Sequence, residues 1–160
     1  MAADRHTRRR FLRWVGTGGL LSLPLQRAVA ADSAHEGFFG QPEHRVVYQF
    51  NKADTDYMEH VLFSVGAMLR KYPDNIHIVV TAIGPGVHIL AKRPGRPVPD
   101  LVRQRVESLA MYGVSFHACG NTLKSLGWTA DDLREFVEIV DVGAADLMTL
   151  QARGYSYISW

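Results

Sequence analysis

The chain has 160 residues, 47% of them hydrophobic, and a formal net charge of +2. The positive charge belongs to residues 1–30, which hold six arginines and one aspartate, so the other 130 residues carry 12 basic and 15 acidic side chains and a net charge of −3. A weakly acidic segment of this length can form one domain with its own core. It lacks the basic excess typical of nucleic-acid-binding domains, so we expect no nucleic-acid partner.

The N-terminus has the pattern of an export signal. Paired arginines at Arg8 and Arg9 precede an uncharged stretch at 14–25, and the small residues at 28–30 form a cleavage site of the A-x-A type. The uncharged stretch is shorter than the roughly 20 apolar residues of a membrane span. The arginine pair resembles a twin-arginine (Tat) signal. We therefore expect removal of residues 1–30 on Tat export, a periplasmic location, and no stable membrane insertion after cleavage.

The first elements after this signal follow from local patterns. Residues 31–44 have no hydrophobic period and are interpreted as a linker or arm. Residues 45–50 are β-branched and aromatic, which predicts a strand. Apolar residues recur at intervals of three and four over 58–69, which predicts an amphipathic helix that Pro73 ends. Residues 76–83 are apolar on both faces, as in a strand of a sheet covered on both sides.

The rest of the sequence continues to alternate between β-rich runs and amphipathic segments. Glycines and helix-capping residues mark the ends of the segments. The expected elements are a tight turn at 84–86, a helix from Asp100 that Gly113 ends, a strand at 114–118 leading to Cys119, a short helix at 121–126, a helix capped at 129–132 with Leu133 and Phe136 inside, a strand at 137–142, a helix at 144–153 and a strand at 155–160.

This alternation predicts the fold class. We expect one α/β domain over residues 45–160, with a mainly parallel five-stranded sheet and helices on both faces. Binding and catalytic sites of such folds gather at the carboxyl ends of the strands. Asn51, Gly84, Gly86 and Cys119 fall there and are candidate site residues.

Cys119 is the single cysteine of the chain and the strongest candidate for chemistry. A lone thiol cannot form an internal disulfide, so in an oxidising compartment it is buried, paired between chains, or reactive. Where a strand leads into a helix, unpaired N–H groups and the positive end of the helix dipole stabilise a thiolate, which is the nucleophilic form. The placement favours a reactive thiol, and burial as a small hydrophobic side chain is the alternative.

The neighbours of Cys119 are candidate helpers. Gly120 would let a bulky sulfur donor approach the backbone closely. Asn121 or Thr122 can cap the following helix and orient its N–H groups toward the sulfur, or cap it with no further role. His117 shares a strand face with Cys119, about 6.6 Å away along the chain. It is a candidate general base, although a hydrogen-bonded histidine on the sheet face is the favoured interpretation.

Metal and nucleotide sites are not predicted. The seven histidines show no metal-ligand spacing and there is no C-x-x-C pair. The glycines at 84–86 lack the G-x-G-x-x-G spacing of a dinucleotide-binding loop. We expect neither metal nor cofactor. Lys92, Arg93 and Arg96 form a basic loop that either attracts an anionic substrate or a partner surface, or is simply solvated.

Three segments together resemble the DsrE/DsrF-like proteins with their YchN-like fold: the turn at 84–86, the cysteine segment at 116–123, and the tail at 150–158. The resemblance extends from residue 45 to residue 160, and the cysteine segment is its most specific part. It implies an α/β domain that assembles as homotrimers or homohexamers. It also implies a sulfur carrier, in which one cysteine holds a persulfide and passes the sulfur to the next protein. Cys119 matches that cysteine.

The leading hypothesis is an exported, homo-oligomeric protein that binds or carries sulfane sulfur on Cys119. It would be a sulfurtransferase-like carrier at most, exchanging sulfur with a protein or a small sulfur compound. The alternative is a non-catalytic periplasmic binding or assembly module in which Cys119 is structural. A third hypothesis is a disulfide between two copies of Cys119. A relay thiol must be reachable and ionised near neutral pH, which separates the first hypothesis from the second.

Overall fold

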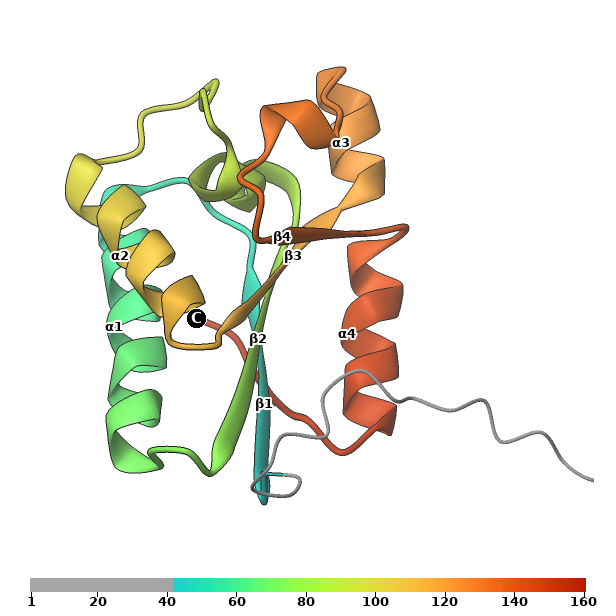
Figure 1. Ribbon diagram of the computed structural model, residues 1–160. Helices are drawn as coiled ribbons and strands as arrows, with labels where there is room; N and C mark the ends of the chain where they lie inside the picture. The colour runs from blue at the N-terminus through green and yellow to red at the C-terminus, as the bar shows by residue number, and fades with distance from the viewer. Residues whose placement is uncertain (1–41) are drawn as a thin grey trace, which may run out of the picture. The chain divides into compact units, whose positions relative to one another are not determined.

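The computed structural model describes residues 42–160, and in this part a five-stranded parallel sheet carries helices on both faces (Figure 1). The strand order is β4-β3-β2-β1-β5. The fold class predicted from the sequence is therefore confirmed. The predicted signal at 1–30 lies outside the described residues, as does most of the predicted linker at 31–44. The strands are β1 (His44–Phe50), β2 (Ile76–Ala82), β3 (Ser115–Cys119), β4 (Val137–Val140) and β5 (Ser156–Ile158).

The helices of the described part are of two kinds. The α-helices connect successive strands, as the right-handed crossovers of a parallel sheet require. Two short 3₁₀-helices follow β2 and α3. The α-helices are α1 (Thr55–Lys71), α2 (Asp100–Met111), α3 (Gly120–Leu126) and α4 (Gly143–Ala152), and the 3₁₀-helices are η1 (Gly84–Leu90) and η2 (Ala130–Asp132). None of the helices in the described range is long and apolar enough to cross a bilayer.

One face of the sheet holds the main core. Successive strand residues point to opposite faces, and alternate residues of β1, β2 and β3 meet α1, α2 and η1 on this side (Figure 1). Tyr48, Phe50, Ile78 and Phe116 are among its fully or almost fully buried side chains. Burying a side chain of this size contributes roughly 1.5–3 kcal/mol. This core explains why alternate residues of β2, namely Ile78, Val80 and Ala82, are apolar.

The opposite face is covered by α4. Leu147 and Leu150 of this helix pack on Val47 of β1 and Val79 of β2 in a smaller core. Polar side chains replace apolar ones on this face toward β3, where His117 and Thr81 lie in parallel register. Cys119, two residues after His117 in β3, points to this same face. The face with the smaller apolar core is thus the one that carries the thiol.

Two local predictions differ from the structure. The residues at 84–90 form the 3₁₀-helix η1 instead of a simple turn. The predicted helix with Leu133 and Phe136 inside is wrong, because η2 ends at Asp132. Asp132 completes a capping box with Thr129 after one turn, and the Arg134 N–H then donates to the Leu90 carbonyl at 3.0 Å. The chain thus turns to pair with the end of η1, which buries Leu133 and leaves Phe136 37% exposed.

Candidate functional site

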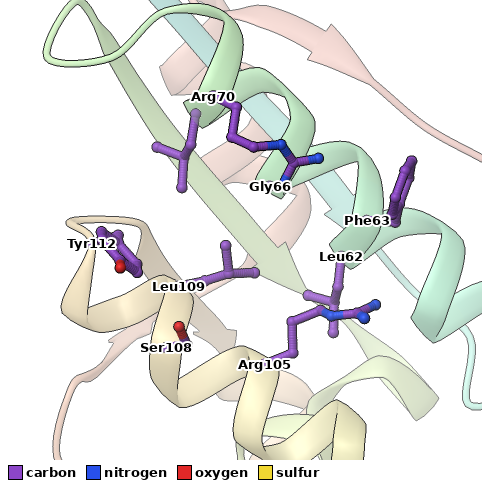
Figure 2. Close-up of a pocket in the computed structure, with 9 residues that line it drawn as sticks. Leu62, Phe63, Gly66, Arg70, Arg105, Ser108, Leu109 and Tyr112 are labelled. Atoms are coloured by element: carbon purple, nitrogen blue, oxygen red, sulfur yellow. The ribbon is translucent and has the colours of Figure 1, made fainter.

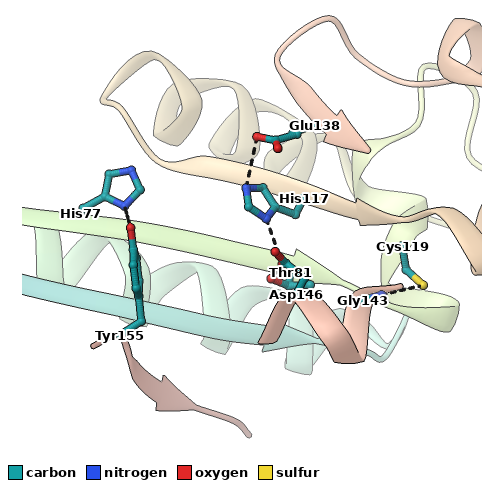
Figure 3. A network of polar contacts seen from close by, with 8 residues as sticks. All are labelled: His77, Thr81, His117, Cys119, Glu138, Gly143, Asp146 and Tyr155. Atoms are coloured by element: carbon teal, nitrogen blue, oxygen red, sulfur yellow. Dashed lines mark hydrogen bonds and ion pairs between the residues drawn. The ribbon is translucent and has the colours of Figure 1, made fainter. Parts of the chain in front are cut away.

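Cys119 is the last residue of β3 and the N-cap residue of α3. Its residue surface is only 4% exposed. The Gly143 N–H donates a hydrogen bond to Sγ of Cys119 at 3.2 Å (Figure 3). Because Gly143 is the first residue of α4, the thiol lies at the start of two helices, whereas the sequence indicated only one.

Gly143 is required by close packing at this point. A Cβ atom there would lie 2.6 Å from Cγ1 of Ile83 and 3.0 Å from Cβ of Cys119. Any larger residue would have to push α4 away from the end of β3. The absence of a side chain at Gly143 therefore permits the N–H···S contact.

The surroundings of Cys119 lower the pKa of its thiol. Burial by itself raises that pKa, since it disfavours the charged form. The raising effect is outweighed by hydrogen bonds from the Gly143 N–H, from the hydroxyl and N–H of Thr122, and from the N–H of Asn121. The Asn121 N–H is shared, because it also donates to the Asp141 carbonyl at 3.2 Å. The net effect favours the thiolate.

Thr122 connects Cys119 to the end of β2. Its Oγ1 accepts a hydrogen bond from the Gly84 N–H at 3.0 Å, which leaves the hydroxyl hydrogen for the sulfur. Gly84 has a positive φ of 54°, a conformation that favours glycine. Of the sequence-predicted residues, Gly84, Asn121 and Thr122 are thus brought together around Cys119.

Gly120 and Gly86 pack against the protein's own backbone. A Cβ atom at Gly120 would lie 3.0 Å from the Val140 carbonyl oxygen. At Gly86 it would lie 2.1 Å from the carbonyl oxygen of Phe50. Both glycines therefore allow close contact between elements of the fold, in addition to any contact with a ligand.

Asn51 belongs to the connection between β1 and α1, which is separate from the thiol. Its N–H donates to the Tyr57 hydroxyl at 3.1 Å, and that hydroxyl lies 3.2 Å from Oδ1 of Asn51. The Tyr57 hydroxyl also donates to the Gln49 carbonyl at 3.1 Å. These bonds fix the connection between β1 and α1. They do not join Asn51 to the residues around Cys119.

His117 has two acidic neighbours on the α4 side of the sheet (Figure 3). Its Nδ1 lies 2.9 Å from Oδ2 of Asp146, and its Nε2 lies 3.5 Å from Oε2 of Glu138. The Thr81 hydroxyl donates to the same Oδ2 of Asp146 at 2.7 Å. Within the described residues no hydrogen bond joins His117 to Cys119, so the favoured interpretation of a hydrogen-bonded sheet-face histidine fits the geometry.

The pKa of Asp146 is lowered by the same contacts. Burial raises it, but the hydrogen bonds from His117 and Thr81 and the electrostatic interactions with His117 and Arg153 outweigh that effect. Sequence reasoning missed Asp146 and Gly143. The available signal was their place in the first turn of the helix after β4, because helix N-termini and strand carboxyl ends meet at the same edge of a parallel sheet.

A groove of about 310 Å³ lies over this part of the sheet. It is lined from β3, β4 and α4, with the side chains of His117, Glu138, Asp146 and Arg153 at its wall. Val140, which pairs with Cys119 in the sheet, and Val142, which precedes Gly143, also line it. The groove therefore extends to the segment that contacts the thiol. Among the described residues, no three His, Cys, Asp or Glu side chains are placed to hold a metal ion.

Comparison with protein families identifies the chain. The model of the DsrE/DsrF-like family matches residues 29–160. The chain belongs to the DsrE/DsrF-like family. Among curated proteins, a search found no match to this sequence.

Solved structures with the same fold agree with this membership. MTH1491 of Methanobacterium thermoautotrophicum, described as a protein of unknown function, is 28% identical, with a TM-score of 0.66 over 74% of this chain and 100% of its own. The YchN protein of E. coli is 15% identical, with a TM-score of 0.62 over 73% of this chain and 99% of its own. BT1422 of Bacteroides thetaiotaomicron, also of unknown function, is 14% identical, with a TM-score of 0.56 over 72% of this chain and 94% of its own.

Proposed function

We propose that this DsrE/DsrF-like protein carries sulfane sulfur as a persulfide on Cys119. The observation that supports this most is the set of donors around the sulfur: the Gly143 N–H, the Thr122 hydroxyl and the helix N–H groups that together lower the pKa of the thiol. A thiolate is the form that attacks sulfur. The association of the family with sulfur relay supports the same role.

The proposed step is an exchange of one sulfur–sulfur bond for another. The Cys119 thiolate attacks the outer sulfur of a persulfide or polysulfide donor. A new bond forms to Sγ of Cys119, the donor's own sulfur–sulfur bond breaks, and the donor leaves as a thiolate. Transfer to an acceptor thiolate is the same reaction in reverse. The chain would thus return to its starting state without an external oxidant or reductant.

The groove over β3 and β4 is the route by which we expect a donor or acceptor to reach the thiol. It extends to the strand residue beside Cys119 and to the residue before Gly143. Its wall carries both acidic and basic side chains, among them the exposed Glu138 of β4 and Arg153, which caps the C-terminus of α4. Such a mixed wall suits a small polar sulfur compound or the tip of a partner protein.

Export and self-association complete the proposal. The arginine pair at Arg8 and Arg9 supports Tat export to the periplasm. Replacing both with lysine should then leave the chain in the cytoplasmic fraction, whereas lysine at Arg13 should not. The exposed apolar side chain of Ile139 on the edge strand β4, 43% exposed, supports self-association, for which we propose a homotrimer or homohexamer.

The burial of Cys119 favours a second function. At 4% exposure the thiol resembles a structural cysteine as much as a relay thiol. In this alternative the protein is a non-catalytic oligomeric module that binds or assembles partners in the periplasm, and Cys119 packs the junction of β3 with α3 and α4.

Sulfur loading separates the two functions. The full chain would be incubated with polysulfide at pH 7, freed of excess reagent, and examined by intact-mass spectrometry. The carrier function predicts added mass in sulfur-sized steps, its absence in Cys119→Ser, and its removal by a small thiol acceptor. A folded chain that stays unmodified, and takes up sulfur only after denaturation, would support the structural function.

A further inference from the structure

A second groove lies on the opposite face of the sheet, between α1 and α2, and is separate from Cys119. Its volume is about 500 Å³, which is within the range of small-molecule sites of roughly 300–1,000 Å³. Figure 2 shows its lining side chains. They come from two helical stripes: Leu62, Phe63, Gly66, Leu69 and Arg70 of α1, and Arg105, Ser108, Leu109 and Tyr112 of α2 and its C-cap.

The groove has an apolar floor and an exposed aromatic side chain at each end. Leu62 and Leu109 are buried beneath it, whereas Phe63 is 63% exposed and Tyr112 is 76% exposed. Exposed apolar surface that is continuous with a groove and bordered by polar side chains is a feature of ligand-binding sites. The aromatic rings stand at the two ends of the groove in Figure 2.

Two arginines add positive charge to this apolar surface. The guanidinium groups of Arg70 and Arg105 extend toward the Phe63 end of the groove (Figure 2). Arg70 lies over the Phe63 ring, 5.9 Å from its centroid. Gly66 leaves room for this conformation, since a Cβ there would come within 3.3 Å of Nη1 of Arg70. Within the described residues neither arginine forms an ion pair with a carboxylate.

We propose that the groove between α1 and α2 binds a small anionic amphiphile, a molecule with an apolar body and one carboxylate, sulfate or phosphate end. The anionic end would lie between Arg70 and Arg105, whose planar guanidinium groups suit such oxygens. The apolar body would run along Leu109 toward Tyr112. This is a binding site in addition to the thiol, and it does not depend on sulfur transfer.

The size of the groove favours a small molecule over a protein partner. Its lining along α1 runs from Leu62 to Arg70, about 12 Å of helix. Nine residues line it, whereas a stable protein–protein interface uses roughly 20–30 residues on each side. The charge favours an anion over a neutral or cationic ligand.

The test is a titration of the full chain with decanoate by isothermal calorimetry, below the concentration at which decanoate forms micelles. Decanol and decyltrimethylammonium serve as probes of the same chain length without the negative charge. We expect saturable binding of one decanoate per chain and at least tenfold weaker binding of the other two. Decyl phosphate should bind comparably to decanoate, which would define the site by charge and not by the carboxylate.

Matched variants locate the binding. The pair Arg70→Gln and Arg105→Gln should weaken decanoate binding at least tenfold, while Lys124→Gln, at an exposed position on α3 outside the groove, should leave it unchanged. Circular dichroism of each variant would verify that it folds. Equal binding of decanol, equal binding by the double arginine variant, or no binding would each overturn the proposal. No binding together with a loss of self-association in Phe63→Asp would assign the groove to contact between copies of the chain.

Discussion

At the residue scale, the polar groups of the candidate site gather on one side of the sheet. Cys119, His117 and Thr81 all lie on the side that α4 covers, and the first turn of α4 supplies Gly143 and Asp146 to them. Each buried polar atom of this group has a partner, as buried polar groups require. The same helix terminus thus stabilises a thiolate through its N–H and positions a carboxylate for His117.

Asp146 gives a stability prediction. Asp146→Ala removes the acceptor of two hydrogen bonds and leaves the fully buried Thr81 hydroxyl without a partner. We expect a loss of about 1–3 kcal/mol in the free energy of unfolding at pH 7. Asp146→Asn should lose less, because its amide oxygen can still accept from Thr81. Urea denaturation of the three proteins would measure both differences.

The pH dependence of that loss follows from the lowered pKa of Asp146. A carboxyl group whose pKa is lower in the folded state stabilises the fold above its unfolded pKa, about 3.9, and loses this contribution as the pH falls through its folded pKa. The difference between wild type and Asp146→Asn should therefore shrink in acid. An equal difference at pH 7 and pH 3 would contradict a role for the negative charge.

At the scale of elements, close backbone contact holds the start of η1, just after β2, against the end of β1. The Ile83 N–H donates to the Phe50 carbonyl at 2.9 Å, and Gly86 packs against that same carbonyl. Gly86→Ala places a Cβ atom where backbone already lies, so we expect destabilisation by at least about 2 kcal/mol.

Gly66→Ala is the matched control for this substitution. Its new methyl group meets only the flexible Arg70 side chain at 3.3 Å, and alanine is the better residue inside a helix by up to about 1 kcal/mol. Thermal unfolding should therefore show a large fall in Tm for Gly86→Ala, with no fall for Gly66→Ala. If both variants changed the Tm by similarly small amounts, the backbone around Gly86 would have adjusted to the new methyl group, and the expected clash would be wrong.

The elements also show what the sequence could predict. The local pattern of apolar residues and helix-ending residues predicts the strand that ends at Cys119 and the helices α1, α2 and α4, and the structure confirms them. The failure at Leu133 and Phe136 has a tertiary cause, since the pairing of Arg134 with Leu90 ends the helix after one turn. A capping signal at Thr129 marks where a helix starts and carries no information about where it stops.

The candidate site was predictable only in part for a related reason. Cys119, Asn121 and Thr122 are neighbours in sequence, and the helix start among them is a local feature. Gly143 and Asp146 reach the same place through a parallel crossover, 24 residues from Cys119 and 29 residues from His117 respectively. Their contacts depend on the register between β3 and β4, which the apolar patterns of these strands do not specify.

At the scale of the whole molecule, self-association is expected at the edge strand β4. Ile139 is 43% exposed on this strand, and a lysine there would place a charge in the proposed contact between copies. We expect Ile139→Lys to reduce the assembly to a single chain. Met111→Lys, at an 88% exposed position on α2, should keep the oligomer.

Light scattering coupled to gel filtration would measure these masses. A wild-type protein that is monomeric at tens of micromolar would contradict the expected trimer or hexamer. An oligomer unchanged by Ile139→Lys would place the contact elsewhere on the surface.

The pH dependence of Cys119 alkylation in the folded chain tests the central claim most directly. Because the pKa of the thiol is lowered, the rate should rise with pH and reach half its maximum below about 8.5, the ordinary thiol value. Thr122→Val should move this midpoint upward by removing the hydroxyl, and Thr122→Ser should preserve it. A midpoint at or above the ordinary value, or a thiol that reacts only after unfolding, would contradict the carrier function and leave Cys119 as a structural residue.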